Sequence, residues 1–150
     1  MSAPPALVYL DTNVLIGIVQ ALPQLTERQL ALLGDLDGGR LRGMTSELSL
    51  SEVLVGPLQQ GDATTFDAFI ALLSGDGAIA VMPVSRDVLI AAARHRATSR
   101  MKLPDAIHVA TADVAGCAGF VSADRGVRLP AGMRAMVWDR LDPPGQETVA

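Results

Sequence analysis

Short apolar runs alternate along the chain with longer stretches in which apolar residues recur every three or four positions. The short runs predict β-strands and the longer stretches predict helices. We expect strands at residues 7–10, 41–45, 79–83, 120–122 and 135–138. We expect helices at residues 14–19, 26–36, 46–58, 61–73, 85–97 and 104–115.

Local signals mark several of the helix ends. Thr26 and Gln29 have the spacing of a capping box, and Gly38 and Gly39 end the helix that follows. Pro104 stands where the last helix begins, because its missing N–H costs nothing in a first turn. These signals support the alternation of strands and helices.

Alternating strands and helices of this kind predict the α/β fold class. Because the strands are almost continuously apolar, we expect a parallel sheet of about four or five strands with helices on both faces. Neither a repeat nor a linker divides the sequence, so residues 1–141 are expected to form a single domain. Residues 142–150 are rich in Pro and polar residues, which predicts a flexible tail.

Composition narrows the class of protein. A chain of 150 residues that is 49% hydrophobic can build a core without disulfides or structural metal. Its one cysteine, Cys117, excludes an internal disulfide and agrees with a reducing cytoplasm. The apolar stretch from Ala6 to Leu22 is interrupted by Asp11, Thr12 and Asn13, so we expect no membrane span and no secretory signal.

The charge balance is acidic, with sixteen acidic residues against twelve basic ones and a net charge of −4. Nucleic-acid-binding proteins are more often basic. However, eleven of the twelve cations are Arg, whose planar guanidinium binds phosphate in a bidentate manner. Net charge therefore does not decide whether the chain binds nucleic acid.

Four acidic residues are expected at one edge of the sheet. Asp11 directly follows the first strand, and Asp124 follows the strand at 120–122 by one residue. Asp105 lies in the first turn of the last helix, and Glu52 lies inside the helix after the second strand. Ligands of open parallel sheets bind at the carboxyl ends of the strands, so these side chains are candidates for one site.

Each acid also has a purely structural interpretation. Asp11 could cap the next helix, Asp105 could complement a helix dipole, and Asp124 could belong to a turn. Glu52 could close a capping box with Ser49. Taken together, however, converging carboxylates repel one another unless a cation neutralises them. Hard oxygen ligands suit Mg²⁺ or Mn²⁺, which support phosphoester hydrolysis.

Four segments resemble the sequence motifs of PIN domains. They are Val8–Ile16, Thr45–Leu54, Leu103–Ala112 and Phe120–Asp124, and they occur in the expected order over residues 7 to 138. The resemblance implies a Rossmann-like PIN fold and Mg²⁺- or Mn²⁺-dependent cleavage of RNA. For a chain of this length it also implies a toxin ribonuclease of the VapC type, from a type II toxin–antitoxin pair.

The resemblance further implies roles and partners. The expected partners are an RNA substrate, an inhibitory antitoxin protein and a second copy of the chain in a homodimer. The metal ligands and catalytic residues would be Asp11, Glu52, Asp105 and Asp124. The supporting residues would be Thr12, Asn13 and Ser122.

The chain departs from the family pattern at the fourth motif. Many relatives have a run like Thr-Asn-Asp with a further acid or aromatic residue after it, whereas this chain has Ser122, Ala123 and Asp124 followed by Arg125. We therefore expect one metal ion rather than two.

His108 lies three residues after Asp105, and we interpret it as a packed helix residue outside the site.

Basic residues flank the acidic ones and are candidates for contacts with RNA phosphates. They are Arg94, His95, Arg96, Arg100 and Lys102 before Asp105, and Arg125 and Arg128 after Asp124. The sequence also leaves open a catalytically degenerate PIN-like module that binds RNA or protein without cleaving.

The apolar residues at 14–22 and 68–73 are more numerous than we expect the core of a small domain to need. We therefore expect part of them to form an oligomer or partner surface.

Overall fold

A computed structural model describes residues 3–141, with the exception of the side chain of Leu22. The predicted tail at 142–150 lies outside the described residues. Five strands form one parallel sheet in the order β3-β2-β1-β4-β5, which confirms the expected fold class. The strands are β1 (Ala6–Leu10), β2 (Leu41–Ser46), β3 (Ile79–Met82), β4 (Gly119–Ser122) and β5 (Arg134–Val137).

Six α-helices connect or flank these strands, close to their predicted positions. They are α1 (Thr12–Gln20), α2 (Glu27–Asp37), α3 (Glu47–Gln60), α4 (Ala63–Leu72), α5 (Arg86–Thr98) and α6 (Leu103–Ala115). The capping box of Thr26 and Gln29 is present at the start of α2. The sequence did not predict the two short 3₁₀ helices η1 (Leu22–Gln24) and η2 (Trp138–Arg140).

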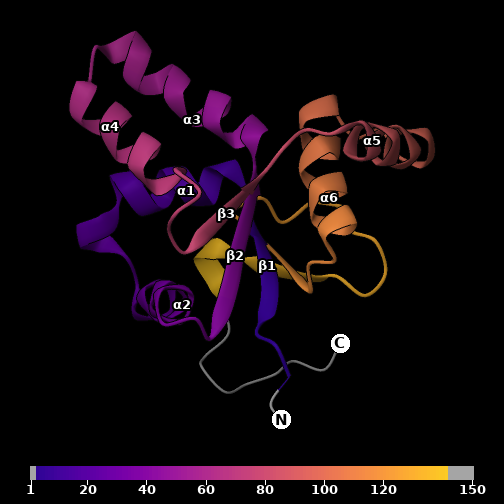
Figure 1. The fold of residues 1–150 in the computed structure, drawn as a ribbon, viewed down its shortest axis with the longest axis horizontal. Helices are drawn as coiled ribbons and strands as arrows, with labels where there is room; N and C mark the ends of the chain where they lie inside the picture. The colour runs from indigo at the N-terminus through magenta and orange to yellow at the C-terminus, as the bar shows by residue number, and fades with distance from the viewer. Residues whose placement is uncertain (1–2, 142–150) are drawn as a thin grey trace.

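Side-chain alternation in β1 separates the two faces of the sheet. Val8 and Leu10 face one core with α1, α2, α3 and α4, whereas Tyr9 faces a second core with α6. Successive residues of a strand point to opposite faces, so burial of both faces explains why β1 is apolar throughout. Figure 1 shows the result: α1 to α4 lie on one side of the sheet and α5 and α6 lie on the other.

Most of the apolar residues that the sequence offered as a partner surface belong to the core. Val14, Leu15 and Phe69 are completely buried, and Ile18 and Leu73 are 7% exposed. The expectation that these stretches exceed the core is therefore wrong for these residues. The α3–α4 hairpin extends beyond the sheet (Figure 1), and its outer side chains supply exposed apolar surface instead.

The strand order creates a switch point between β1 and β4. The chain builds outward from β1 to β2 and β3 on one side, and then crosses to β4 and β5 on the other. A crevice at the carboxyl ends of the two strands is the usual ligand site of such sheets.

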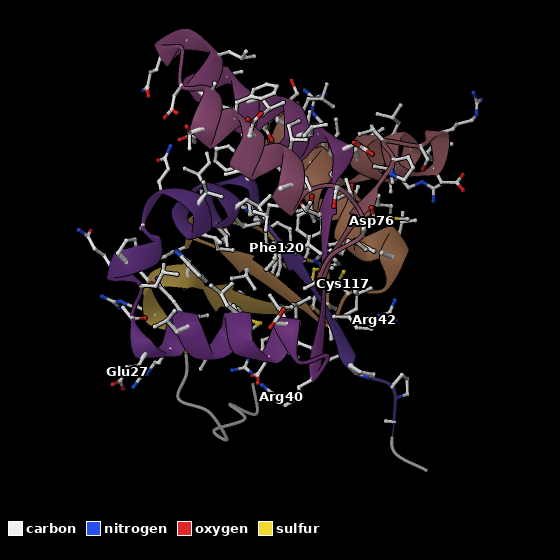
Figure 2. All side chains as sticks on the ribbon, turned by 60° about the vertical axis from the view of Figure 1, so that its left-hand side comes forward. Glu27, Arg40, Arg42, Asp76, Cys117 and Phe120 are labelled. Atoms are coloured by element: carbon white, nitrogen blue, oxygen red, sulfur yellow. The ribbon has the colours of Figure 1, made fainter. Side chains whose placement is uncertain are left out.

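Figure 2 shows Phe120 and Cys117 inside the molecule, with Arg40 and Arg42 at its surface where the chain enters β2. No helix among residues 3–141 is long and apolar enough to cross a membrane.

Candidate active site

Asp11 lies at the switch point, directly after β1. Its backbone N–H bonds to the carbonyl of Val121 across 2.9 Å, which continues the pairing of β1 with β4. Its Oδ1 accepts a hydrogen bond from the N–H of Thr12 at 2.9 Å, so Asp11 caps α1. Its Oδ2 accepts a hydrogen bond from the hydroxyl of Ser122 at 2.8 Å. The capping role is therefore real, but it occupies only one of the two carboxylate oxygens.

Ser122 and Asn13 hold the turn that carries Asp124. The backbone N–H of Asp124 donates to the Ser122 hydroxyl across 3.0 Å. The side chain of Asn13 accepts from the N–H of Ala123 at 3.0 Å and donates to the Ser122 hydroxyl at 3.3 Å. Asp124 itself accepts a bond from the N–H of Gly126 at 2.8 Å. The end of β4 is thus bound to the first turn of α1 by side-chain hydrogen bonds.

Asp105 and Asp124 line the same open pocket, which has a volume of about 620 Å³. Asp105 is exposed in the first turn of α6, and Asp124 is exposed on the loop after β4. Three cationic residues line this pocket with the two acids: Arg100, Lys102 and Arg128. The pocket therefore combines carboxylates that suit a divalent cation with side chains that suit a phosphate.

Glu52 lies on α3 and is held by two partners. Its Oε1 is 2.6 Å from Nε2 of His108 and accepts a hydrogen bond from the Thr12 hydroxyl at 2.8 Å. The suggested capping box with Ser49 is wrong, because α3 already begins at Glu47 and is capped by Ser46. Ser49 is buried instead and lies 2.7 Å from the Thr45 hydroxyl.

The electrostatics of Asp11 and Glu52 differ in direction. Burial raises the pKa of Asp11, and the nearby carboxylate of Asp105 adds to this; His108 and the Ser122 hydroxyl oppose it without cancelling it. The hydrogen bond from His108 lowers the pKa of Glu52. A neighbouring cation would therefore stabilise the ionised form of Asp11.

The residues of this edge suit a hard divalent cation in their chemistry. Asp11, Asp105 and Asp124 offer carboxylate oxygens, which Mg²⁺ and Mn²⁺ prefer. The raised pKa of Asp11 is the observation that favours such a cation, because a positive charge would relieve the cost of ionising a buried carboxyl. Among residues 3–141, no three His, Cys, Asp or Glu side chains are already close enough together to hold one ion.

The predicted basic residues are divided between separate places. Arg100 and Lys102 line the pocket of Asp105 and Asp124. Arg94 lines a different pocket, between α5 and α6. Arg96 donates to the carbonyl of Met101 at 3.2 Å, and Arg125 lines a second, smaller pocket together with Asp124.

Arg128, which the sequence already offered as a phosphate contact, lines the pocket. The structure adds one residue to those selected from the sequence. His108 bonds directly to Glu52, although the sequence interpretation left it outside the site. Its place one turn after Asp105 on the same helix face was a usable signal. The connection to Glu52 was not visible, because it depends on how α6 packs against α3.

The fold resembles those of several solved toxin–antitoxin proteins. A toxin–antitoxin complex from Klebsiella pneumoniae is 21% identical, with a TM-score of 0.63 over 84% of this chain and 94% of that one. VapBC2 from Rickettsia felis, bound to a promoter DNA fragment, is 14% identical, with a TM-score of 0.69 over 89% and 99%. VapC20 from Mycobacterium tuberculosis, a toxin that cleaves the sarcin–ricin loop, is 16% identical, with a TM-score of 0.57 over 75% and 86%.

At these identities the likeness shows a shared fold. A search of curated protein sequences gave no match. The model of the PIN domain family matches residues 8–132, which is most of the chain and includes the ends of β1 and β4 where the acidic residues lie. The chain therefore belongs to the PIN domain family.

Proposed function

We propose that this protein is a metal-dependent endoribonuclease that hydrolyses RNA phosphodiester bonds. One observation carries the proposal: Asp105 and Asp124 share a pocket with Arg100, Lys102 and Arg128. Carboxylates that suit a divalent cation and cationic side chains that suit a phosphate both support metal-assisted phosphodiester hydrolysis. Membership of the PIN domain family supports the same function.

Each side chain has a defined part in this proposal. Asp11, Asp105 and Asp124 would hold Mg²⁺ or Mn²⁺, with Glu52 contributing from α3. The chemistry that such an ion would supply when bound is activation of water and stabilisation of the phosphodiester oxygens. Ser122 orients Asp11 through its hydroxyl, which also holds the turn of Asp124.

The cationic residues bind substrate rather than metal. Arg100, Lys102 and Arg128 neutralise RNA phosphates on both sides of the bond to be cut, which supplies affinity without sequence readout. Arg94 and Arg96 lie outside this pocket, so they contribute at most to longer RNA molecules. Arg125 lines the smaller pocket beside Asp124 and can contact a neighbouring phosphate. Stacking on aromatic residues plays a small part, since the chain has only five of them.

We also propose that the protein is the toxin of a type II toxin–antitoxin pair and works in the cytoplasm. The similar structures from Klebsiella pneumoniae and Rickettsia felis are toxin–antitoxin proteins. An antitoxin would inhibit this chain most directly by placing a cationic side chain among Asp11, Asp105 and Asp124. Co-expression with the protein encoded by the adjacent gene should restore growth that this chain alone arrests.

A homodimer is the proposed assembly. Exposed apolar side chains on the outer side of the α3–α4 hairpin support it: Val55 and Leu58 are 50% and 66% exposed, and Ile70 is 41% exposed. Sedimentation at micromolar concentration should give a dimer, and Leu58→Glu should dissociate it. A monomer for the native chain would contradict this part of the proposal.

The alternative is a PIN domain that binds RNA or protein without cleaving. The separation of the carboxylates favours it, because no three of them among residues 3–141 are close enough to hold an ion as they stand. The two acids and three cations that line one pocket favour the nuclease, since a non-catalytic RNA-binding surface does not need exposed Asp105 and Asp124. We therefore retain the nuclease as the proposed function.

The deciding experiment is RNA cleavage by the purified chain. End-labelled structured RNAs, including the sarcin–ricin loop, are incubated with Mg²⁺, with Mn²⁺ and with chelator. Asp105→Asn serves as the inactive variant, and Asp76→Asn, an exposed residue of the turn before β3, serves as its matched control. Cleavage that needs metal and disappears only in Asp105→Asn supports the nuclease. Binding of the same RNAs without cleavage, unchanged by chelator, supports the alternative.

A further inference from the structure

His108 is a buried side chain with a hydrogen-bond partner at each ring nitrogen. It lies on α6 and is only 3% exposed. Its Nδ1 is 2.6 Å from the hydroxyl of Tyr9 on β1, and its Nε2 is 2.6 Å from Oε1 of Glu52 on α3. The Thr12 hydroxyl, which donates to the same Oε1, also lies 3.2 Å from Nε2. One imidazole therefore connects the centre of the sheet to the acidic edge.

The chemistry of the two partners determines where the protons of this imidazole lie. The carboxylate of Glu52 can only accept, so Nε2 must carry the hydrogen between them. Tyr9 is fully buried, and a phenol keeps its proton at neutral pH, so Tyr9 can donate it. The neutral arrangement that satisfies both contacts has Tyr9 donating to Nδ1 and Nε2 donating to Glu52.

The carboxylate of Glu52 needs such a partner because its side chain is long and partly exposed, so it can adopt several rotamers. Its side chain is 35% exposed and has three rotatable bonds. His108 and Thr12 both form hydrogen bonds with Oε1. No residue in the described part of the chain forms a hydrogen bond with Oε2. Thr12 directly follows Asp11, so these contacts keep Glu52 next to Asp11 with one oxygen available.

We propose that His108 is a positioning residue: its Nε2–H holds Glu52 at the acidic edge, and the Tyr9 hydroxyl holds His108 in the tautomer that can do so. This inference rests on the proposed function, because it gives Glu52 a place beside the metal-binding aspartates. A hydrogen-bond partner behind a metal-site carboxylate typically changes metal affinity or activity by about 10- to 100-fold. A residue that only fills space would need the volume of His108 but not its N–H.

The proton arrangement is tested on the native chain, without any variant. Nitrogen NMR distinguishes protonated from bare ring nitrogens, and the chain has only two histidines to assign. We expect Nε2 of His108 to be protonated and Nδ1 to be bare, and we expect Tyr9→Phe to disturb that state. A bare Nε2 would overturn the proposal, because His108 could then not donate to Glu52.

The positioning role is tested by Mn²⁺ titration calorimetry on the full chain. His108→Leu keeps most of the volume without a donor, and His108→Gln keeps an amide N–H donor. We expect the Leu variant to bind Mn²⁺ about 10- to 100-fold more weakly, and the Gln variant to recover most of that loss. The matched control is His95→Gln, since His95 lies on α5 beside Asp113 and away from Glu52.

The possible results separate this inference from the proposed function. Equal Mn²⁺ affinity for native, Leu and Gln chains, or an equal loss in both variants, would show that the N–H of His108 does not matter. A native chain that binds Mn²⁺ with the expected variant pattern but cleaves no RNA would contradict the nuclease and leave the role of His108 intact. If His108→Leu does not fold, the NMR state of the native ring and the Gln variant still decide.

Discussion

The hydroxyl of Ser122 donates a hydrogen bond to Oδ2 of Asp11 across 2.8 Å and joins the ends of two neighbouring parallel strands. The same hydroxyl accepts the backbone N–H of Asp124 at 3.0 Å. A single buried oxygen therefore sets the distance between the first and last acidic residues of the candidate site. This relationship, together with the pocket of Asp105, leads to the predictions that follow.

Ser122→Ala should lower both stability and cleavage. The substitution leaves Oδ2 of Asp11 and the N–H of Asp124 without this partner, and losing a buried hydrogen-bond partner costs about 1–3 kcal/mol. For a domain of this size that corresponds to a decrease in Tm of roughly 2–4 °C per kcal/mol. Thermal unfolding measures this decrease in Tm. The control is Ser51→Ala, because Ser51 is an exposed serine of α3. Equal Tm values for the two variants would contradict the role of Ser122.

Asp11→Asn should abolish cleavage and raise Tm at neutral pH. The folded state raises the pKa of Asp11, so between the unfolded and folded pKa values the folded chain holds the extra proton. Stability contributed by this group is then lost as pH rises from about pH 4, and Asn removes that loss. Asn also keeps an oxygen to accept the N–H of Thr12, so the cap of α1 survives.

The sign of this effect is checked by the difference in Tm between the variant and the native chain. We expect the difference to grow as pH rises from about pH 4 to about pH 8. Glu52 acts in the opposite direction, because its lowered pKa stabilises the fold at neutral pH and that stabilisation is lost on acidification. Since Glu52 is present in both chains, its contribution cancels in the difference. A difference that shrinks with rising pH would show that burial of Asp11 is not the dominant cause.

Divalent metal should raise the Tm of the native chain even without RNA. A ligand that binds only the folded state stabilises it by about 2.7 kcal/mol at a concentration of 100 times its Kd. Asp105→Asn should lose most of this increase, whereas Asp76→Asn should retain it. Differential scanning fluorimetry with Mg²⁺, Mn²⁺ and chelator gives the comparison. An increase of the same size in both variants would remove Asp105 from the metal site.

Arg128→Ala should raise KM for RNA more than it lowers kcat. Arg128 lines the pocket of Asp105 and Asp124, and its proposed contact is with a phosphate rather than with the reacting atoms. Loss of one phosphate contact should also reduce the slope of log affinity against log salt by roughly 0.7 for a single-stranded segment. Arg42→Ala is the control, because Arg42 is exposed at the amino end of β2. Equal effects of the two substitutions would mean that only net charge matters.

Local patterns were sufficient to predict the five strands and six α-helices of this fold, but not its two short 3₁₀ helices. The continuous apolar run of β1, the capping box of Thr26 and Gln29 and the proline at the start of α6 all act within a few residues. They can therefore be read directly from the chain. The same holds for the expectation that Asp11 and Asp124 stand at strand ends, because each directly follows or nearly follows an apolar run.

Only the tertiary structure decided which of these residues become neighbours. Asp11 meets Ser122 because β4 pairs with β1 across a crossover of more than a hundred residues, and strand order is not written in any local pattern. His108 reaches Tyr9 and Glu52 because α6 packs against the sheet and against α3 at one particular rotation. By the same rule Arg94 and Arg100, close in sequence, line different pockets. Sequence determined the residues available at the acidic edge, and long-range packing determined how they are connected.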